Sequence, residues 1–300
     1  QRAGQAMKFL LIYYTGTFNT RFLTERLEEA LRAHGHETNR VEIRRNTPPA
    51  ETNGYDFIGF GYPIYGFNSP LPFNRYVQKL KFPPGQKFFI YKNSGETFAM
   101  NNASSRILLR RMKRRKAVFA GEYHFVMPYN IHFAYERNFV REILQKNEKL
   151  LEILVHGLEN GNAPRIKSNP VYNIASAAVS VQKAGGAFNS FFYRVDPEKC
   201  TRCGLCAKNC PEDNIRLENG KVRFGHRCDM CMRCSFFCPA NAIKIGLLEG
   251  WKVNGDYRLG EILREGPPPQ PYITEHSRGF YSCFIRHFAK IDADYEKLFG

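Results

Sequence analysis

The sequence predicts an α/β protein in which a parallel sheet, covered by helices on both faces, precedes a small α+β domain. Two observations lead to this fold class. Apolar runs of strand length alternate with amphipathic helical segments over the first half of the chain, and such alternation is typical of parallel sheets. Further along, a four-cysteine motif closed by proline occurs twice in close succession, which indicates a repeated metal-binding unit.

The strands and helices of the first half can be placed in chain order. The expected strands are 8–14 (KFLLIYY), 37–43, 55–62 (YDFIGFGY), 87–91 and 118–127. The expected helices are 21–34, 72–81, 103–115 and 136–158. Each helical segment repeats apolar residues at three- and four-residue intervals, so each would pack one apolar face on the sheet.

A polar, Gly- and Pro-containing break at 160–170 marks the end of the sheet domain. We therefore expect four regions. These are a sheet domain (7–160), a helical connector rich in small and aromatic residues (161–194), a cysteine-rich domain (195–247) and a C-terminal extension (248–300). Residues 1–6 have no pattern and are interpreted as the remnant of a tag.

Eight of the nine cysteines form two copies of C-x2-C-x2-C-x3-C-P. This spacing is the bacterial pattern for a pair of [4Fe–4S] clusters, in which three closely spaced thiolates hold one cluster and the fourth comes from the other motif. The ligands expected for cluster I are Cys200, Cys203, Cys206 and Cys238. Those expected for cluster II are Cys228, Cys231, Cys234 and Cys210.

Two other interpretations of these cysteines fit the spacing less well. Zinc sites use C-x2-C pairs that lie far apart. Disulfides need an oxidising compartment and cannot pair within such tight loops. The repeat also extends to Ile215 and Ile243, where an apolar side chain can cover a cluster, and a pseudo-twofold βαββαβ unit fits the length of this domain. Cys283 lies outside both motifs and is expected to be a buried or half-buried thiol.

A loop rich in hydroxyl groups follows the first expected strand and immediately precedes a helix. Its side-chain and backbone donors, together with the helix N-terminus, can surround a phosphate. The loop contains neither a P-loop nor a G-x-G-x-x-G pattern, so it suits a phosphomonoester held by neutral donors, as in FMN. Thr and Asn are also ordinary N-caps. The candidate residues are Thr15, Gly16, Thr17, Phe18, Asn19 and Thr20.

The segment KFLLIYYTGTFNTRFLTERL resembles the start of flavodoxins, whose loop reads S/T-x-T-G-N-T. Phe18 stands in place of the usual glycine, and its N–H is available to a phosphate if its φ angle is negative. With the cysteine motifs, residues 7–246 resemble the flavodoxin–ferredoxin fusion family of anaerobic bacteria and archaea. This resemblance implies a flavodoxin-like doubly wound sheet of order 2-1-3-4-5, with FMN between strands 1 and 3.

The resemblance also selects two further loops for the flavin ring. In flavodoxins these positions hold the ring between an aromatic face and backbone amides. Tyr65 is the first candidate for stacking and Tyr62 the second, although either tyrosine can equally be an ordinary core or surface aromatic. The FMN-binding residues implied by these loops are Pro63, Ile64, Tyr65, Gly66, Asn93, Ser94 and Gly95.

Other residues are expected around the flavin. Gly95 would let its peptide flip as the flavin changes protonation. Residues 128–130 follow the fifth strand at the same edge of the sheet and would cap the site. His124 and His132 lie near the predicted flavin edge, but a structural role is commoner for such histidines than a catalytic one. No constellation of catalytic residues stands out.

The chain carries 44 basic and 28 acidic residues, a formal net charge of +16. The densest basic stretch, 106–116, alternates with apolar residues at helical spacing, which favours the solvated face of an amphipathic helix over a docking site for an acidic redox partner. No nucleic-acid recognition motif accompanies the charge. No apolar run reaches the roughly 18 residues of a membrane span. With no secretory signal, thiolate-bound clusters favour the reducing cytoplasm of an anaerobe.

These patterns together predict an electron-transfer flavo-iron–sulfur protein. It would pass electrons between two [4Fe–4S] clusters and FMN, to or from a redox protein partner. The alternative is an FMN-dependent reductase of a small molecule, fed by its own cluster domain. That alternative requires an apolar cavity over the flavin, closed by the C-terminal extension. The sequence leaves open whether the chain is itself an oxidoreductase.

Overall fold

The computed structural model describes residues 6–164, 166, 169–179 and 182–300. Nearly all of the expected tag remnant therefore lies outside the described residues. The main sheet has five strands in the order β2-β1-β3-β4-β5, all paired in parallel. This is the predicted flavodoxin-like order, in which the chain reverses direction across the sheet between β1 and β3.

The strands of this sheet are β1 (Lys8–Tyr13), β2 (Glu37–Glu42), β3 (Phe57–Pro63), β4 (Lys87–Ser94) and β5 (Val118–Val126). The helices between them are α1 (Asn19–Ala33), α2 (Leu71–Lys79), α3 (Arg106–Arg114) and α4 (Arg137–Asn160). Two boundaries differ from the sequence prediction by three residues, and the others by at most two. β4 extends to Ser94, and α3 begins only at Arg106, because residues Ala99–Ser105 form the 3-10 helix η1.

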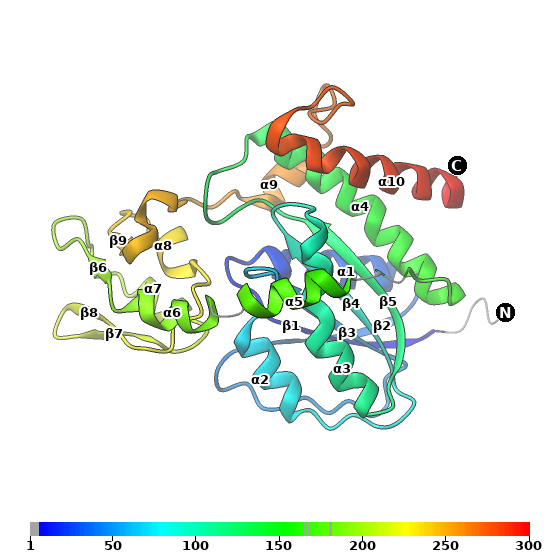
Figure 1. The fold of residues 1–300 in the computed structure, drawn as a ribbon, viewed down its shortest axis with the longest axis horizontal. Coiled ribbons are helices and arrows are strands. Elements are labelled where there is room, and N and C mark those ends of the chain that lie inside the picture. Colours follow the sequence, from blue (N-terminus) through cyan, green and yellow to red (C-terminus); the bar gives the residue numbers. More distant parts are fainter. Residues whose placement is uncertain (1–5, 165, 167–168, 180–181) are drawn as a thin grey trace.

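Helices cover both faces of the sheet (Figure 1). On one face, α1 and α4 pack against Phe9, Leu11 and Tyr91. On the other face, α2 and α3 pack against Ile12 and Phe60. β3 is buried along its whole length, as expected for a central parallel strand that has helices on both sides.

The cysteine-rich domain lies beyond one end of the sheet and follows two connector helices, α5 (Pro170–Val179) and α6 (Gln182–Ser190) (Figure 1). Its elements are β6 (Tyr193–Val195), α7 (Leu205–Asn209), β7 (Ile215–Glu218), β8 (Lys221–Phe224), α8 (Arg233–Phe236) and β9 (Ile243–Ile245). β6 pairs with β9 and β7 pairs with β8, both antiparallel. The predicted βαββαβ order is confirmed.

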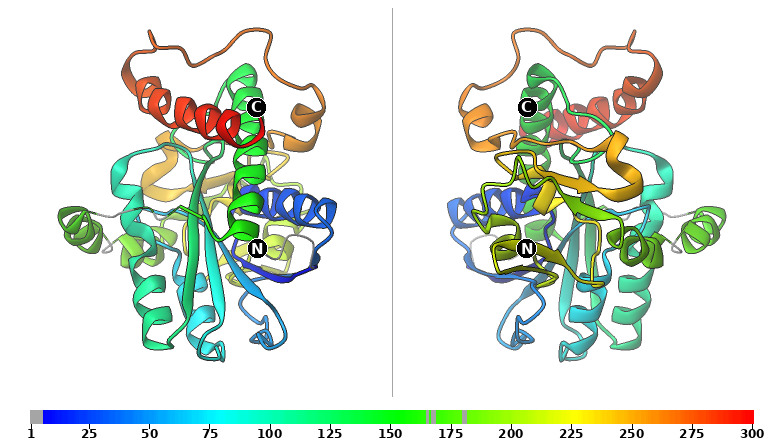
Figure 2. Two further views of the ribbon diagram at one scale, coloured as in Figure 1. Left: turned by 90° about the vertical axis from the view of Figure 1, so that its right-hand side faces the viewer. Right: turned by 90° about the vertical axis from the view of Figure 1, so that its left-hand side faces the viewer.

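The C-terminal extension folds back onto the sheet domain. It contains η2 (Gly246–Trp251), α9 (Leu259–Arg264), η3 (Gly279–Tyr281) and α10 (Ser282–Phe299). Helix α10 lies against α4, and its Phe284 and Phe288 join the core on that face (Figure 2). Within the described ranges, none of the helices is long and apolar enough to cross a membrane.

Candidate cofactor site

A cavity of about 620 Å³ opens at the carboxyl edge of the sheet. The loops that follow β1, β3, β4 and β5 form its floor and sides, and Asp229, Met230 and Met232 of the second cysteine motif form part of the opposite wall. The cavity lies at the switch point of the sheet, where open α/β folds bind their ligands. Its volume is within the usual range for a cofactor or small-molecule site.

Most of the predicted FMN residues line this cavity. Thr15 and Phe18 are the exceptions. The predicted capping residues 128–130 also contribute to the wall. The predicted residues that line the cavity are Gly16, Thr17, Asn19, Thr20, Pro63, Ile64, Tyr65, Gly66, Asn93, Ser94 and Gly95.

Hydrogen bonds fix the hydroxyl-rich loop to its neighbours. The Thr20 hydroxyl donates to the Asn93 side-chain oxygen (2.7 Å), and the Asn130 amide donates to the Thr17 hydroxyl (2.9 Å). The Thr15 hydroxyl is buried, and it has no hydrogen-bond partner among the described residues. A buried polar group without a partner is costly. The loop therefore retains an unused neutral donor, which fits the phosphate site expected here.

Phe18 adopts a backbone conformation that the sequence analysis did not expect. Its φ angle is +68°, in the left-handed region, and not the negative value on which an available N–H was premised. The chain makes here the turn that glycine makes without strain, at a cost of about 1 kcal/mol for a residue with a side chain. Contacts of the Phe18 ring offset this cost. The ring packs on Phe237 at 5.0 Å and under the Arg233 guanidinium at 4.5 Å.

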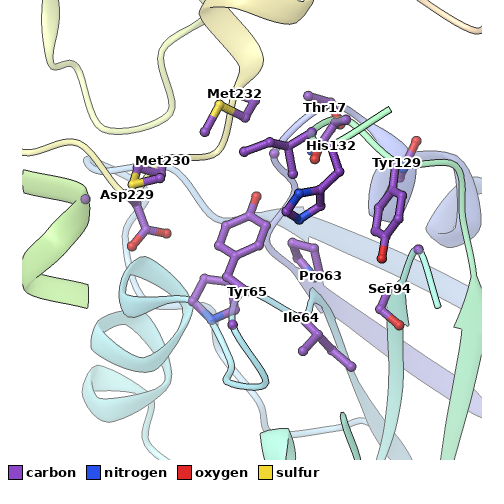
Figure 3. Close-up of a pocket in the computed structure, with 18 of the residues that line it drawn as sticks. Thr17, Pro63, Ile64, Tyr65, Ser94, Tyr129, His132, Asp229, Met230 and Met232 are labelled. Carbon is purple, nitrogen blue, oxygen red and sulfur yellow. The ribbon is translucent and has the colours of Figure 1, made fainter. Parts of the chain in front are cut away.

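The two candidate stacking tyrosines occupy different places. Tyr62 is wholly buried, packs on Phe73 at 4.7 Å and does not line the cavity, because its position in β3 directs it toward α2. Tyr65 projects into the cavity (Figure 3). A Cβ built on Gly16 would lie 2.1 Å from the Tyr65 hydroxyl, so Gly16 must be glycine for this approach. Of the two candidates, Tyr65 is therefore the one positioned to contact a flavin.

A network of polar groups surrounds the end of β4. The Ser94 hydroxyl lies 2.7 Å from His124 Nε2, and Tyr129 donates to Glu96 at 2.5 Å. The Tyr135 hydroxyl donates to the Gly95 carbonyl and so holds this peptide in one orientation. Burial, with help from Lys92 and His287, lowers the pKa of His124 well below its ordinary value. His124 is therefore neutral and structural.

Several residues of the cavity wall were missed by the sequence analysis. Glu96 directly follows the predicted Gly95 in the same loop, but no contact with the flavin was assigned to it. Asp229, Met230 and Met232 come from the second cysteine motif (Figure 3). Trp251 comes from the C-terminal extension, and its carbonyl accepts the His132 N–H at 2.8 Å. No local pattern reveals these contributions, since they depend on how the domains pack.

The thiols of the second motif are grouped with Cys210. Burial raises the pKa of Cys228 to about 11 and of Cys231 to about 12, and it also raises that of Cys234 well above its ordinary value. The nearby Cys210 thiol adds to each increase. Buried thiols of this kind need a metal to hold them as thiolates at neutral pH. The grouping fits the ligand set expected for cluster II.

The remaining evidence on the cysteines concerns the repeat. The Asn214 N–H donates to Cys210 Sγ at 3.3 Å, and the Ala242 N–H donates to Cys238 Sγ at 3.2 Å. The two fourth cysteines thus have equivalent surroundings. Among the described residues, no three His, Cys, Asp or Glu side chains converge on a point that would hold a single metal ion. A [4Fe–4S] cluster takes one thiolate per iron, so its ligands are spread around it.

Arg233 joins the two domains, and the sequence analysis did not single it out. It lies between Cys231 and Cys234, and only 1% of it is exposed. Its guanidinium donates to the carbonyls of Gly16 (2.5 Å), Thr15 (2.6 Å) and Asn209 (3.0 Å). One side chain of the cluster domain therefore holds the backbone of the hydroxyl-rich loop.

Comparisons with known proteins give the class of the cluster domain. The family described as 4Fe-4S binding domain matches residues 193–216. Pyruvate synthase subunit PorD of Methanocaldococcus jannaschii is 36% identical over 66 residues, 21% of this chain and 77% of that protein. Dihydromethanopterin reductase (acceptor) of Methanosarcina mazei is 32% identical over 90 residues, 29% of this chain and 38% of that protein.

Other likenesses cover less of the proteins concerned or are more distant. The chain spans only 21% and 38% of the first two curated relatives that it matches. A solved flavodoxin from the domain Archaea is 12% identical, with a TM-score of 0.38, over 51% of this chain and 99% of that chain. The strand order, rather than this likeness, defines the fold of the N-terminal half.

The C-terminal cluster domain is thus a ferredoxin domain of the 4Fe-4S type. The flavodoxin-like fold of the N-terminal half and the ferredoxin domain that follows it fit a flavodoxin–ferredoxin fusion. This architecture is that of an electron-transfer flavo-iron–sulfur protein in the general sense.

Proposed function

We propose that the chain passes electrons between two [4Fe–4S] clusters and FMN, to or from a redox partner. One observation carries the proposal: Asp229, Met230 and Met232, which flank the expected cluster II ligand Cys231, form a wall of the same cavity that the predicted FMN loops enclose. The clusters would supply one-electron steps and the flavin one- or two-electron steps. The protein's own residues bind these groups and fix their separation.

The donors around the cavity support FMN as the flavin. The hydroxyl-rich loop offers neutral donors and the start of α1 to a phosphomonoester, and the Thr15 hydroxyl is unused by the described residues. On the ring side, Tyr65 offers an aromatic face, while Asn93 and Gly95 offer polar groups at the carboxyl end of β4. A longer dinucleotide would need a second phosphate site, for which no motif is present.

The basic stretch 106–116 is less suited to partner docking than its charge suggested. Arg111 donates to the Asn74 carbonyl (2.7 Å) and Arg115 to the Val77 carbonyl (3.1 Å), so part of this charge holds α3 against α2. Exposed basic side chains also flank the first cysteine motif, where Arg202 and Lys208 lie close in sequence to the exposed Cys203. An acidic redox protein would find complementary charge there.

Cofactor analysis tests the proposal. Protein prepared and reconstituted without oxygen is expected to hold about eight iron and eight sulfide per chain, together with about one FMN. The thiolate-bound clusters also favour a reducing compartment such as the cytoplasm. Zinc in place of iron would overturn the cluster part of the proposal. Less than a tenth of an equivalent of heat-released FMN would overturn the flavin part.

A second candidate function is reduction of a small molecule at the flavin. It is favoured by the apolar residues Phe188, Leu247, Leu248 and Trp251, which extend the cavity wall beyond the predicted FMN loops. Part of the C-terminal extension thus reaches the cavity. Anaerobic stopped-flow of the reduced protein against candidate acceptors separates the two functions. Rapid oxidation at a saturable rate indicates a reductase, and oxidation only by redox proteins indicates a carrier.

A further inference from the structure

The two cysteine motifs differ in their relation to the cavity. We call residues 200–206 loop I and residues 228–234 loop II. Asp229, Met230 and Met232 of loop II line the cavity, whereas no residue of loop I does. Since the FMN loops form much of the remaining wall, loop II faces the predicted flavin and loop I does not.

Loop II also contacts the hydroxyl-rich loop at the backbone. A Cβ built on Gly16 would lie 2.9 Å from the Cys231 carbonyl oxygen and 3.4 Å from Cys231 Cβ. Only glycine allows this approach, because a contact under 3.0 Å would force one of the two loops to move. The backbone of one expected cluster II ligand therefore packs directly on the loop expected to hold the FMN phosphate.

Arg233 makes this contact specific. Its planar fork donates to two consecutive carbonyls, those of Thr15 and Gly16, in a geometry that lysine cannot reproduce. The guanidinium also lies over the Phe18 ring and 3.6 Å from a Glu42 carboxylate oxygen. A buried cation needs such a complete set of partners, so the position of Arg233 relative to the hydroxyl-rich loop is narrowly defined.

The same position of loop I has a different residue and surroundings. Leu205 stands between Cys203 and Cys206 as Arg233 stands between Cys231 and Cys234, and Leu205 is 39% exposed. Cys203 is exposed as well. The two loops thus have the same cysteine spacing, but loop II faces the flavodoxin-like domain and loop I faces solvent.

From this asymmetry we infer an order of electron transfer. Cluster II lies next to the flavin and exchanges electrons with it. Cluster I lies nearer to solvent and exchanges electrons with the external partner. Arg233 is the positioning residue that holds loop II, and with it cluster II, against the hydroxyl-rich loop. The inference rests on the proposed function, since it requires that both clusters and FMN bind. Each step would move one electron from a reduced cluster to the next oxidised group, and the external redox protein would supply that electron.

The test compares Arg233→Gln and Arg233→Lys with Arg216→Gln, the substitution of an exposed arginine in β7 of the same domain. Each reconstituted protein is assayed for iron and FMN, then mixed with a reductant in a stopped-flow instrument. Cluster and flavin absorbance are followed separately. Arg233→Gln is expected to keep its iron and its rate of cluster bleaching, while flavin reduction slows at least about tenfold, since small misplacements of reacting groups are costly.

Further readouts separate positioning from folding. Arg233→Lys is expected to restore part of the flavin-reduction rate, and Arg216→Gln to match the parent protein. Hydrogen exchange of the amides of residues 15–20, measured on cluster-loaded but flavin-free protein, is expected to speed up in Arg233→Gln. If Arg233→Gln loses iron, Gly16→Ala at saturating FMN provides the same test, because its Cβ would meet the Cys231 carbonyl oxygen without altering the cluster motif.

The outcomes are distinct. Unchanged flavin reduction and unchanged exchange in Arg233→Gln, with full iron and FMN, overturn the inference and leave the proposed function intact. Slower flavin reduction in Arg216→Gln but not in Arg233→Gln also overturns the inference. A parent protein that binds no FMN or no iron overturns the proposed function itself.

Discussion

Loop I and loop II have the same cysteine spacing and nearly the same backbone, but they lie in different surroundings. Arg202 and Met230 have φ angles of +58° and +51°, and Gly204 and Met232 have +71° and +62°. Loop II is nevertheless packed on the flavodoxin-like domain, with Met232 and Arg233 buried. The comparison teaches that cysteine spacing and local turns fix the shape of a cluster loop, while the residues between the cysteines determine what the loop contacts.

The turn that the two loops share requires residues with left-handed backbone angles, and the two loops differ in which residue they place there. A left-handed residue costs about 1 kcal/mol unless it is glycine. Loop I has glycine at position 204, whereas loop II places Met232 there. Met232 is buried, and it packs with Tyr193 and Ile245 in the core of the ferredoxin domain. Burial of the Met232 side chain offsets the backbone strain, which loop I avoids by having glycine at the same position.

The largest effect is expected from removing the exchanged fourth ligands. Cys210→Ala should destroy cluster II and Cys238→Ala cluster I, each leaving about four iron per chain. Cys210→Ala should also stop electrons from reaching the flavin, although its cysteine belongs to the first motif. Iron analysis and EPR of the reduced proteins check this pairing. Loss of cluster I in Cys210→Ala would show that each motif binds its own cluster.

A second effect concerns the glycines of the two regions. Gly16→Ala should weaken FMN binding at least about tenfold, equivalent to about 1.4 kcal/mol, because its Cβ meets Tyr65 and Cys231. Gly204→Ala in loop I meets nothing closer than 3.9 Å and should cost only the strain of its positive φ, about 1 kcal/mol. Fluorescence titration with FMN checks the first value and thermal unfolding the second. Equal FMN affinities in the two variants would contradict the account.

A third, smaller effect should be seen for the unused hydroxyl. Thr15→Val is expected to weaken FMN binding about threefold to tenfold, the usual contribution of one hydrogen bond. Thr201→Val, on the exposed loop I, is the matched control and should bind FMN like the parent protein. Isothermal titration of both variants measures the difference. Tighter binding by Thr15→Val would show that this hydroxyl does not serve the phosphate.

The smallest effect is expected from salt. If an acidic redox protein docks beside loop I, its rate of electron delivery should fall as ionic strength rises, since exposed charges are screened within about 10 Å at 0.1 M. Transfer from cluster II to the flavin should not change, because Arg233 is buried. Stopped-flow at several salt concentrations follows both steps. Salt-dependent transfer from cluster II to the flavin would contradict the buried contact.

Much of the fold was predictable because its signals are local. The alternation of strands and helices, the sheet order and the βαββαβ repeat all follow from periodicity, spacing and family resemblance. The loop residues of the site were predictable for the same reason, since parallel strands bring their carboxyl ends to one edge. Tyr62 was the clear failure, because its direction depends on the register of β3, and one residue reverses the side that a strand residue faces.

The contacts between domains were not predictable from the chain. Arg233 looks like any basic residue in a cysteine loop, and only packing shows that it binds the carbonyls of Thr15 and Gly16. Trp251 likewise reaches the cavity from a region without a recognisable pattern. The left-handed φ of Phe18 depends on partners from the ferredoxin domain, Phe237 and Arg233. Such features arise from the tertiary structure and override local preference.

The central claim is that clusters and flavin exchange electrons within one chain, through loop II. The most direct measurement is the rate constant of flavin reduction after rapid reduction of the clusters, taken over a tenfold range of protein concentration. We expect a rate constant of flavin reduction that does not change with protein concentration, since loop II and the predicted FMN loops line the same cavity. A rate that falls in proportion to dilution, or a flavin that stays oxidised while the clusters remain reduced, would contradict it.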